Sequence, residues 1–84
     1  MLMEYYVYIL QSIKDQKFYI GSTSDPKARL IFHNKGLQRS TKNRIPFKLV
    51  YTEICTDKKD ALRREKQIKS FKGGEAFQKL IFGT

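Results

Sequence analysis

The chain has 84 residues, of which 17 are Lys or Arg and 8 are Asp or Glu, so it carries a formal net charge of +9. This length leaves room for one modest hydrophobic core, which predicts a single domain over residues 1–84 and argues against two. A hydrophobic content of 40% favours a folded domain over a disordered one. The positive charge favours a polyanionic partner, with nucleic acid and a membrane surface as alternatives, although solubility alone also explains it.

The sequence favours a cytoplasmic protein. Its longest apolar run, residues 5–10, is far shorter than the roughly 20 residues that a membrane-spanning helix needs. The first residues, MLME, lack the basic and apolar regions of a secretory signal. Cys55 is the only cysteine, so it cannot form an internal disulfide, and we expect it to pack as a small strand residue in a reducing compartment.

Two apolar runs near the N-terminus predict a β-hairpin. Residues 4–11 (EYYVYILQ) and 17–21 (KFYIG) are rich in aromatic and β-branched side chains, which favour strands. The polar residues 12–16 separate the two runs and are expected to form the turn.

A short amphipathic helix is predicted next, over residues 27–34. Residues 24–26 (Ser-Asp-Pro) combine an N-cap candidate with a proline at the first helical position, and residues 34–36 (Asn-Lys-Gly) form a stop signal. The apolar side chains of this helix are spaced to share one face, which we expect to point inward: Ala28, Ile31 and Phe32.

The second half of the chain predicts a basic loop, a strand and two helices. The loop covers residues 37–44, the strand 47–55, one helix residues 57–71 and a last helix 75–82 after a glycine pair. The predicted fold class is therefore α+β, a ββαβαα domain with a three-stranded sheet flanked by helices.

One acidic residue of the second predicted helix lies on its apolar face. Glu65 is placed inside the stripe formed by Ala61, Leu62 and Ile68. Removing an unpaired carboxylate from water costs several kcal/mol, so Glu65 should face a cation, hydrogen-bond donors or a water-filled cleft. The alternative is an ion pair with one of the many lysines or arginines, and the pattern does not decide between them.

Two further groups of polar side chains suit phosphate chemistry. Arg29 and His33 are four residues apart and share a helix face, which we expect to lie away from the apolar stripe. Together they can hold a phosphate and relay a proton, but they can also lie on a solvated face. Tyr6, Tyr8 and Tyr19 can bring phenols together across the hairpin, or can serve only as packing.

These elements together resemble the GIY-YIG nuclease family, and in particular its small stand-alone members. The triplet Tyr6-Val7-Tyr8 is followed after ten residues by Tyr19-Ile20-Gly21. Arg29 lies ten positions beyond Tyr19, and His33 and then Glu65 follow. The similarity extends over essentially the whole chain and includes the DPKARL stretch and the ALRREKQIK helix.

The resemblance implies a role for each residue of this pattern. Tyr8 and Tyr19 would approach the attacking water and the scissile phosphate, and Arg29 would steady the phosphate charge. Glu65 would bind one divalent metal ion, Mg²⁺ or Mn²⁺, while His33 lies where several relatives carry a helper histidine. The metal would polarise the phosphate while a tyrosine accepts a proton from water.

Three more residues are expected near this site: Tyr6, Gly21 and Lys17. Because a free phenol is a weak base at neutral pH, a cation such as Arg29, Lys17 or the metal is expected to lower its pKa. Tyr6 replaces the glycine of the family's first triplet, and residues 72–84 contain no asparagine of the kind that many relatives place late in the domain. A degenerate nucleic-acid-binding module of the same fold is therefore the alternative to an active enzyme.

The basic side chains suit contacts to phosphates better than base reading, which predicts little sequence specificity. We expect DNA in preference to RNA. Two alternatives also explain the basic side chains: a solvated helix face, or a surface that docks an acidic protein. The residues expected to contact nucleic acid are Lys35, Arg39, Lys42, Arg44, Arg63, Arg64 and Lys69.

Overall fold

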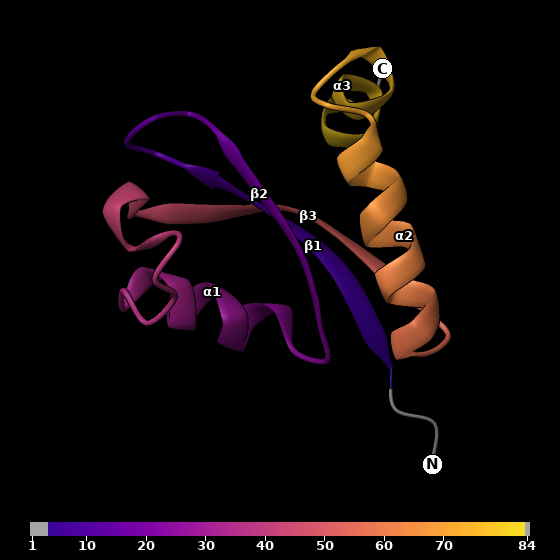
Figure 1. Ribbon diagram of the computed structural model, residues 1–84, viewed down its shortest axis with the longest axis horizontal. Helices are drawn as coiled ribbons and strands as arrows, with labels where there is room; N and C mark the ends of the chain where they lie inside the picture. The colour runs from indigo at the N-terminus through magenta and orange to yellow at the C-terminus, as the bar shows by residue number, and fades with distance from the viewer. Residues whose placement is uncertain (1–3, 84) are drawn as a thin grey trace.

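Residues 4–83, the part of the chain described by the computed structural model, fold in the order ββαβαα. Its elements are β1 (Tyr5–Ser12), β2 (Phe18–Thr23), α1 (Pro26–Asn34), a short 3-10 helix η1 (Lys42–Arg44), β3 (Phe47–Cys55), α2 (Lys58–Ser70) and α3 (Glu75–Phe82). The strands form one antiparallel sheet in the order β2-β1-β3. In Figure 1, α1 lies on one side of this sheet and α2 and α3 on the other. The α+β prediction is confirmed.

β1 is the central strand, and both of its faces are covered. Val7 and Ile9 point toward α2, whereas Tyr8 and Leu10 point toward α1, and all four are at most 1% exposed. Burial on both faces explains why this segment reads as one continuous apolar run rather than as an alternating one.

Two hydrophobic clusters hold the helices on the sheet. The cluster under α2 and α3 contains Val7, Ile9, Ala61, Ile68 and Phe77. The cluster on the α1 side is smaller, because polar side chains occupy part of that space; its buried members are Tyr8, Leu10 and Phe47. None of the helices within residues 4–83 is long and apolar enough to cross a membrane.

The helix boundaries follow the capping signals of the sequence. Asp25 caps α1 by accepting a hydrogen bond from the backbone N–H of Ala28, at 3.2 Å, and Pro26 is the first helical residue. Gly36 follows α1 with a left-handed φ of 74°. Asp57 caps α2 in the same way, by accepting from the N–H of Asp60 at 2.8 Å.

The predicted inward face of α1 is wrong for two of its three residues. Ile31 is 54% exposed and Ala28 is also exposed, and only Phe32 is half-buried. His33 is completely buried and Arg29 is half-buried instead. The polar face of α1 turns toward the sheet because His33 finds buried hydrogen-bond partners there. Hydrogen bonding offsets the free-energy cost of removing these polar groups from water. The alternative of a solvated His33 is thereby excluded.

The stripe predicted for α2 is correct in part. Ala61 and Ile68 are fully buried, but Leu62 is 48% exposed. The Glu65 side chain is only 17% exposed, so the prediction that it lies on the inward face is confirmed. Arg64 precedes it and points toward β3, where it makes two hydrogen bonds to Glu53.

Candidate active site

Tyr8 lies directly over Gly21. The two residues are partners in the β1–β2 register, and the Tyr8 ring crosses β2 at this point. A Cβ atom on residue 21 would be 2.7 Å from the Tyr8 hydroxyl oxygen and 2.8 Å from ring atom Cζ. Glycine is therefore required here by the approach of the ring rather than by an unusual backbone angle.

His33 connects α1 to the Tyr8 phenol. Its Nε2 is 3.1 Å from the Tyr8 hydroxyl oxygen in a buried hydrogen bond, and its Nδ1 is 2.9 Å from Thr41 Oγ1. The Tyr19 ring packs beside the imidazole, with centroids 4.7 Å apart, and lies 6.2 Å from the Tyr8 ring. Neighbouring Asn34 ties the end of α1 to β3 by exchanging two hydrogen bonds with the backbone of Phe47.

Tyr8, Tyr19 and His33 together form what we call the phenol cluster. Arg29 brings a positive charge to it. It lies one helical turn before His33, with its guanidinium 4.2 Å from the centre of the Phe32 ring. Its Nε is buried and has no hydrogen-bond partner among the described residues. A buried donor without a partner is costly, and a planar guanidinium is well suited to an anionic oxygen such as that of a phosphate.

The local charges act on both Tyr8 and His33. Burial is the largest cause of a raised pKa of the Tyr8 phenol; nearby Arg29 opposes that rise, whereas Tyr19 and the Glu65 charge add to it. Burial, helped by the Arg29 charge, holds the pKa of His33 below its usual value. His33 is therefore neutral at pH 7 and keeps a lone pair on one ring nitrogen.

Glu65 lies on α2, across the sheet from α1. Its charge is the smallest of the influences on the raised pKa of the Tyr8 phenol. In the structure Lys69 donates to Glu65 at 2.6 Å, so the ion-pair alternative left open by the sequence is observed. Lys69 is 54% exposed and one turn away on the same helix, so solvent reaches this pair from the side of the lysine.

A metal ion would depend mainly on this one carboxylate. Among residues 4–83, no group of three or more His, Cys, Asp or Glu side chains is placed to hold an ion. Mg²⁺ is commonly bound by one or two carboxylates together with water and substrate phosphates. The donor set around Glu65 therefore fits Mg²⁺ or Mn²⁺ and does not fit a structural zinc site.

Two residues expected near the site lie apart from the phenol cluster. Tyr6 donates from its hydroxyl to Glu4 at 2.8 Å and lines a groove of about 330 Å³ beside the start of α1. Lys17 is exposed at the end of the β1–β2 turn, and its side chain has no polar partner in the described part of the chain. Tyr6 therefore does not crowd Tyr8 or Tyr19.

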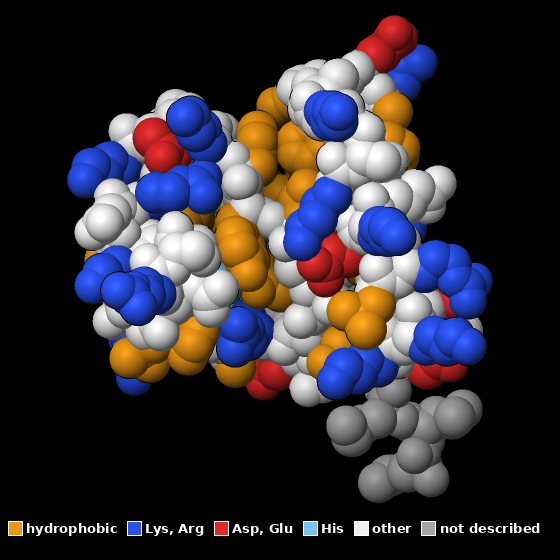
Figure 2. All heavy atoms as spheres, viewed as in Figure 1, with side chains coloured by type: hydrophobic (Ala, Val, Ile, Leu, Met, Phe, Trp, Pro, Cys, Tyr) orange, Lys and Arg blue, Asp and Glu red, His pale blue; other side chains and the backbone are white. Residues whose placement is uncertain are grey.

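The basic residues divide into exposed and structural ones. Lys35, Arg39 and Lys42 are exposed and belong to the α1 end and the following loop, whose Gln38 contacts the Tyr19 hydroxyl at 3.5 Å. Figure 2 shows Lys and Arg side chains on both sides of an apolar band between the half of the molecule with α1 and the half with α2. Exposed positive charge in the loop around Gln38 therefore lies close to Tyr19.

Two arginines expected to contact nucleic acid are engaged within the fold. Arg44 pairs with Asp15 at 2.9 Å, and Arg64 pairs with Glu53 at 2.7 Å; both arginine side chains are less than one-third exposed. Arg63 is 72% exposed and makes only a surface contact with Asp60. The sequence does not reveal which arginines are used internally, because their partners come from distant segments.

Thr41 and Gln38 are the site residues that sequence reasoning missed. Both lie in the loop predicted to be only basic and polar, yet Thr41 is 1% exposed. No periodicity or motif distinguishes this threonine from its exposed neighbours, so only the folded loop identifies it.

Comparisons with known proteins show the family of the chain. Residues 4–75 match the family model of the GIY-YIG catalytic domain. A UPF0213 protein of Staphylococcus haemolyticus is 42% identical over 71 residues, covering 83% of this chain and 85% of that protein. A UPF0213 protein of Clostridium perfringens is 39% identical over 74 residues, covering 87% of this chain and 78% of that protein.

A solution NMR structure of a UPF0213 protein from Bacillus halodurans is 36% identical in sequence, with a TM-score of 0.47. It covers 93% of this chain, and the match spans 97% of that protein. The family match extends over most of the chain, from residue 4 to residue 75. The chain therefore belongs to the GIY-YIG family of nuclease-type domains, together with the UPF0213 proteins.

Proposed function

We propose that the protein is a metal-dependent endonuclease that hydrolyses phosphodiester bonds of nucleic acid. The observation that carries this proposal is the buried hydrogen bond between Tyr8 and His33, with Arg29 nearby, whose buried Nε has no partner within residues 4–83. A phenol bonded to a neutral imidazole next to an anion-binding guanidinium is a suitable arrangement for activating water against a phosphate.

Tyr8 and His33 act together as the base. As water attacks, its proton passes to the Tyr8 oxygen while the phenolic proton passes to His33 Nε2, which is 3.1 Å away. The water oxygen forms the new bond to phosphorus, and the bond to the leaving 3′ oxygen breaks with its electron pair. The depressed pKa of His33 keeps this residue unprotonated and ready at neutral pH.

Arg29 and Glu65 stabilise the negative charge of the phosphate, Arg29 directly and Glu65 through a metal ion. The Arg29 Nε, which has no partner in the described residues, donates to a phosphate oxygen. Glu65 would hold the metal ion, which would replace its contact with Lys69. When bound there, Mg²⁺ or Mn²⁺ would neutralise charge on the phosphate and the leaving oxygen, and would offset the carboxylate charge that raises the pKa of Tyr8.

The proposed substrate is DNA in preference to RNA, cut with little sequence specificity. Exposed basic residues at the end of α1 and in the following loop border the cluster, and such side chains contact phosphates irrespective of sequence. The residues that we propose for contacts to phosphates are Lys35, Arg39 and Lys42 in this region, and Arg63 and Lys69 on α2.

The test is cleavage of single-stranded, duplex, flap and branched DNA, with RNA alongside, in Mg²⁺, in Mn²⁺ and in a chelator. Wild type should cut only with metal. Tyr8→Phe should lower the single-turnover rate by roughly 100-fold or more, since general bases contribute about 10²–10⁴. Tyr6→Phe is the matched control and should cut normally, because within residues 4–83 the Tyr6 hydroxyl donates to the exposed Glu4 and not to His33.

Two outcomes would contradict the proposal. Equal loss in Tyr6→Phe and Tyr8→Phe would show that the phenol bonded to His33 has no special role. Salt-sensitive binding without metal-dependent products, on every substrate, would favour a nucleic-acid-binding module, for which the observed Glu65–Lys69 pair is the supporting observation.

A further inference from the structure

We propose that Thr41 is a positioning residue that holds His33 in the tautomer with the proton on Nδ1, leaving Nε2 to accept the proton of Tyr8. The catalytic consequence of this inference rests on the proposed function, but the tautomer itself does not. The inference follows from two independent sets of contacts, one at each nitrogen of the imidazole ring.

The first set surrounds Nδ1. Thr41 Oγ1 is 2.9 Å from His33 Nδ1 and is also within reach of the Gln38 carbonyl oxygen, at 3.4 Å. A hydroxyl has one proton to donate, and the carbonyl can only accept it. With its proton directed to Gln38, the Thr41 oxygen accepts from Nδ1–H of His33. Thr41 is 1% exposed, so water does not readily replace either contact.

The second set surrounds Nε2. The buried Tyr8 hydroxyl lies 3.1 Å from His33 Nε2, and the positive charge of Arg29 acts to lower the pKa of the phenol. A guanidinium has donors only. Among the described residues, His33 Nε2 is therefore the acceptor available to the phenolic proton, which requires Nε2 to be unprotonated. Both ends of the ring thus indicate the same tautomer.

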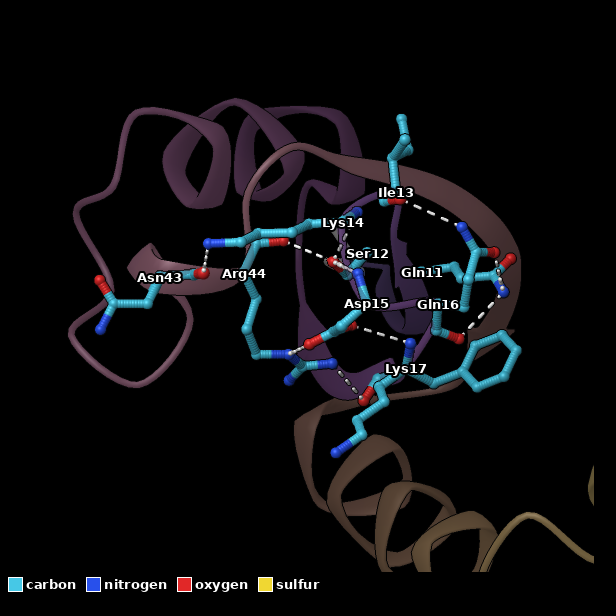
Figure 3. A network of polar contacts seen from close by, with 10 residues as sticks. Gln11, Ser12, Ile13, Lys14, Asp15, Gln16, Lys17, Asn43 and Arg44 are labelled. Atoms are coloured by element: carbon cyan, nitrogen blue, oxygen red, sulfur yellow. Dashed lines mark hydrogen bonds and ion pairs between the residues drawn. The ribbon is translucent and has the colours of Figure 1, made fainter.

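The loop that carries Thr41 is fixed by the β1–β2 turn. Thr41 directly precedes η1, and the N–H of Arg44 donates to the Thr41 carbonyl at 2.9 Å. In Figure 3, Ser12 donates to the carbonyl oxygen of Arg44, Lys14 Nζ donates to that of Asn43 at 3.0 Å, and Arg44 pairs with Asp15 at 2.9 Å. These contacts hold the Thr41 hydroxyl at a fixed place beside the imidazole.

This contact matters because the tautomer of a buried histidine is set by the hydrogen bond of its other nitrogen. Without the Thr41 oxygen, Nδ1–H would be left without an acceptor, and the proton would move to Nε2. The imidazole would then present a donor to Tyr8 and could no longer take the phenolic proton.

Nitrogen-15 NMR of the imidazole tests the inference directly, because His33 is the only histidine of the chain and its signals need no assignment. At neutral pH, wild type should show a protonated Nδ1 and an unprotonated Nε2. Thr41→Val, which removes the hydroxyl at nearly constant shape, should shift the population toward the Nε2–H form. Thr41→Ser should restore the wild-type pattern.

Cleavage provides the second readout. We expect Thr41→Val to lower the single-turnover rate roughly 10- to 100-fold, as is typical when a partner that orients a histidine is lost, and Thr41→Ser to recover most of it. Thr56→Val is the matched control, since Thr56 is exposed just before α2, its hydroxyl donates to Asp60, and the change should affect neither tautomer nor rate.

The outcomes separate the two proposals. An Nε2–H tautomer in wild type, or an unchanged tautomer in Thr41→Val, would overturn the role of Thr41 whatever the cleavage data show. The predicted tautomers in a wild type that cuts no substrate would support Thr41 and contradict the proposed function. If Thr41→Val fails to fold, the wild-type spectrum and the Thr41→Ser variant still decide the tautomer.

Discussion

The contact between the Tyr8 ring and the bare Cα of Gly21 predicts a strong effect of the smallest possible side chain. In Gly21→Ala the new Cβ would lie within 2.9 Å of three Tyr8 atoms. Because Tyr8 is 1% exposed, its ring has little room to move. We expect a loss of about 1–3 kcal/mol in the free energy of unfolding, measured by urea denaturation, together with reduced cleavage.

The control for Gly21→Ala is the same substitution in a Tyr8→Ala background, where the ring is absent. There the added methyl should have a much smaller effect, so the double-mutant cycle should show a large coupling between the two sites. Equal losses in the two backgrounds would place the strain elsewhere in the molecule.

Burial of a neutral His33 predicts that acid weakens the fold. Its pKa is lowered in the folded state, whereas unfolded histidine titrates near 6.5. Between these two values the unfolded chain binds more protons, so stability rises with pH in this window and is lost as the pH falls below about 6.5. The unfolding free energy of wild type should therefore decline between about pH 7 and about pH 5.

His33→Gln should show a flatter dependence over the same range, because the chain has no other histidine. Urea titrations at several pH values measure both curves. Parallel curves for wild type and His33→Gln would contradict a buried neutral imidazole.

Sequence spacing was sufficient to place Arg29 and His33 on one face of α1 and to place Glu65 on the inward face of α2. It was not sufficient to predict which face of α1 packs against the sheet. Hydrophobic periodicity predicted the wrong face because it assigns polar residues to solvent, whereas His33 is buried by partners from β1 and the loop. Thr41 could not be found, since its role depends on a contact across eight residues that no local pattern encodes.

At the level of whole elements, hydrogen bonds and an ion pair connect the β1–β2 turn to η1. These contacts predict that substitutions of two arginines of the basic loop will affect stability and DNA binding differently. Arg44 pairs with Asp15 and also donates to the carbonyl of Phe18, at 3.4 Å. Arg44→Met should therefore lower the unfolding free energy by roughly 1–2 kcal/mol and speed hydrogen exchange in residues 37–46. Arg39→Met, at an exposed position, should leave both unchanged and weaken DNA binding instead.

Hydrogen-exchange mass spectrometry together with a binding titration separates the two variants. Weak binding but normal exchange in Arg44→Met would show that this side chain serves the substrate surface, as the sequence suggested, rather than the loop.

The elements themselves were largely predictable. Strands and helices follow from apolar runs, caps and glycines, and the last helix matches its predicted range, Glu75–Phe82. The irregularity between Ile9 and Leu10 in the β1–β3 pairing, and the short helix η1, were not predictable, because both depend on contacts between segments distant in sequence.

For the whole molecule, the net charge of +9 predicted the kind of partner, but the fold decides which charges are available to it. Several basic side chains are committed to ion pairs that stabilise the fold, while others are exposed on both sides of the apolar band in Figure 2. The Glu65–Lys69 pair is the decisive case, since the proposed function requires that a metal ion displace this lysine.

Single-turnover DNA cleavage as a function of Mg²⁺ or Mn²⁺ concentration, in wild type, Glu65→Gln and Lys69→Gln, tests that requirement most directly. At saturating DNA, Glu65→Gln should lose roughly 100-fold or more, a few kcal/mol of transition-state stabilisation. Lys69→Gln should keep the maximal rate and reach it at lower metal concentration, because the competing cation is gone. Wild-type cleavage by Glu65→Gln, or cleavage that persists in a chelator, would contradict the account.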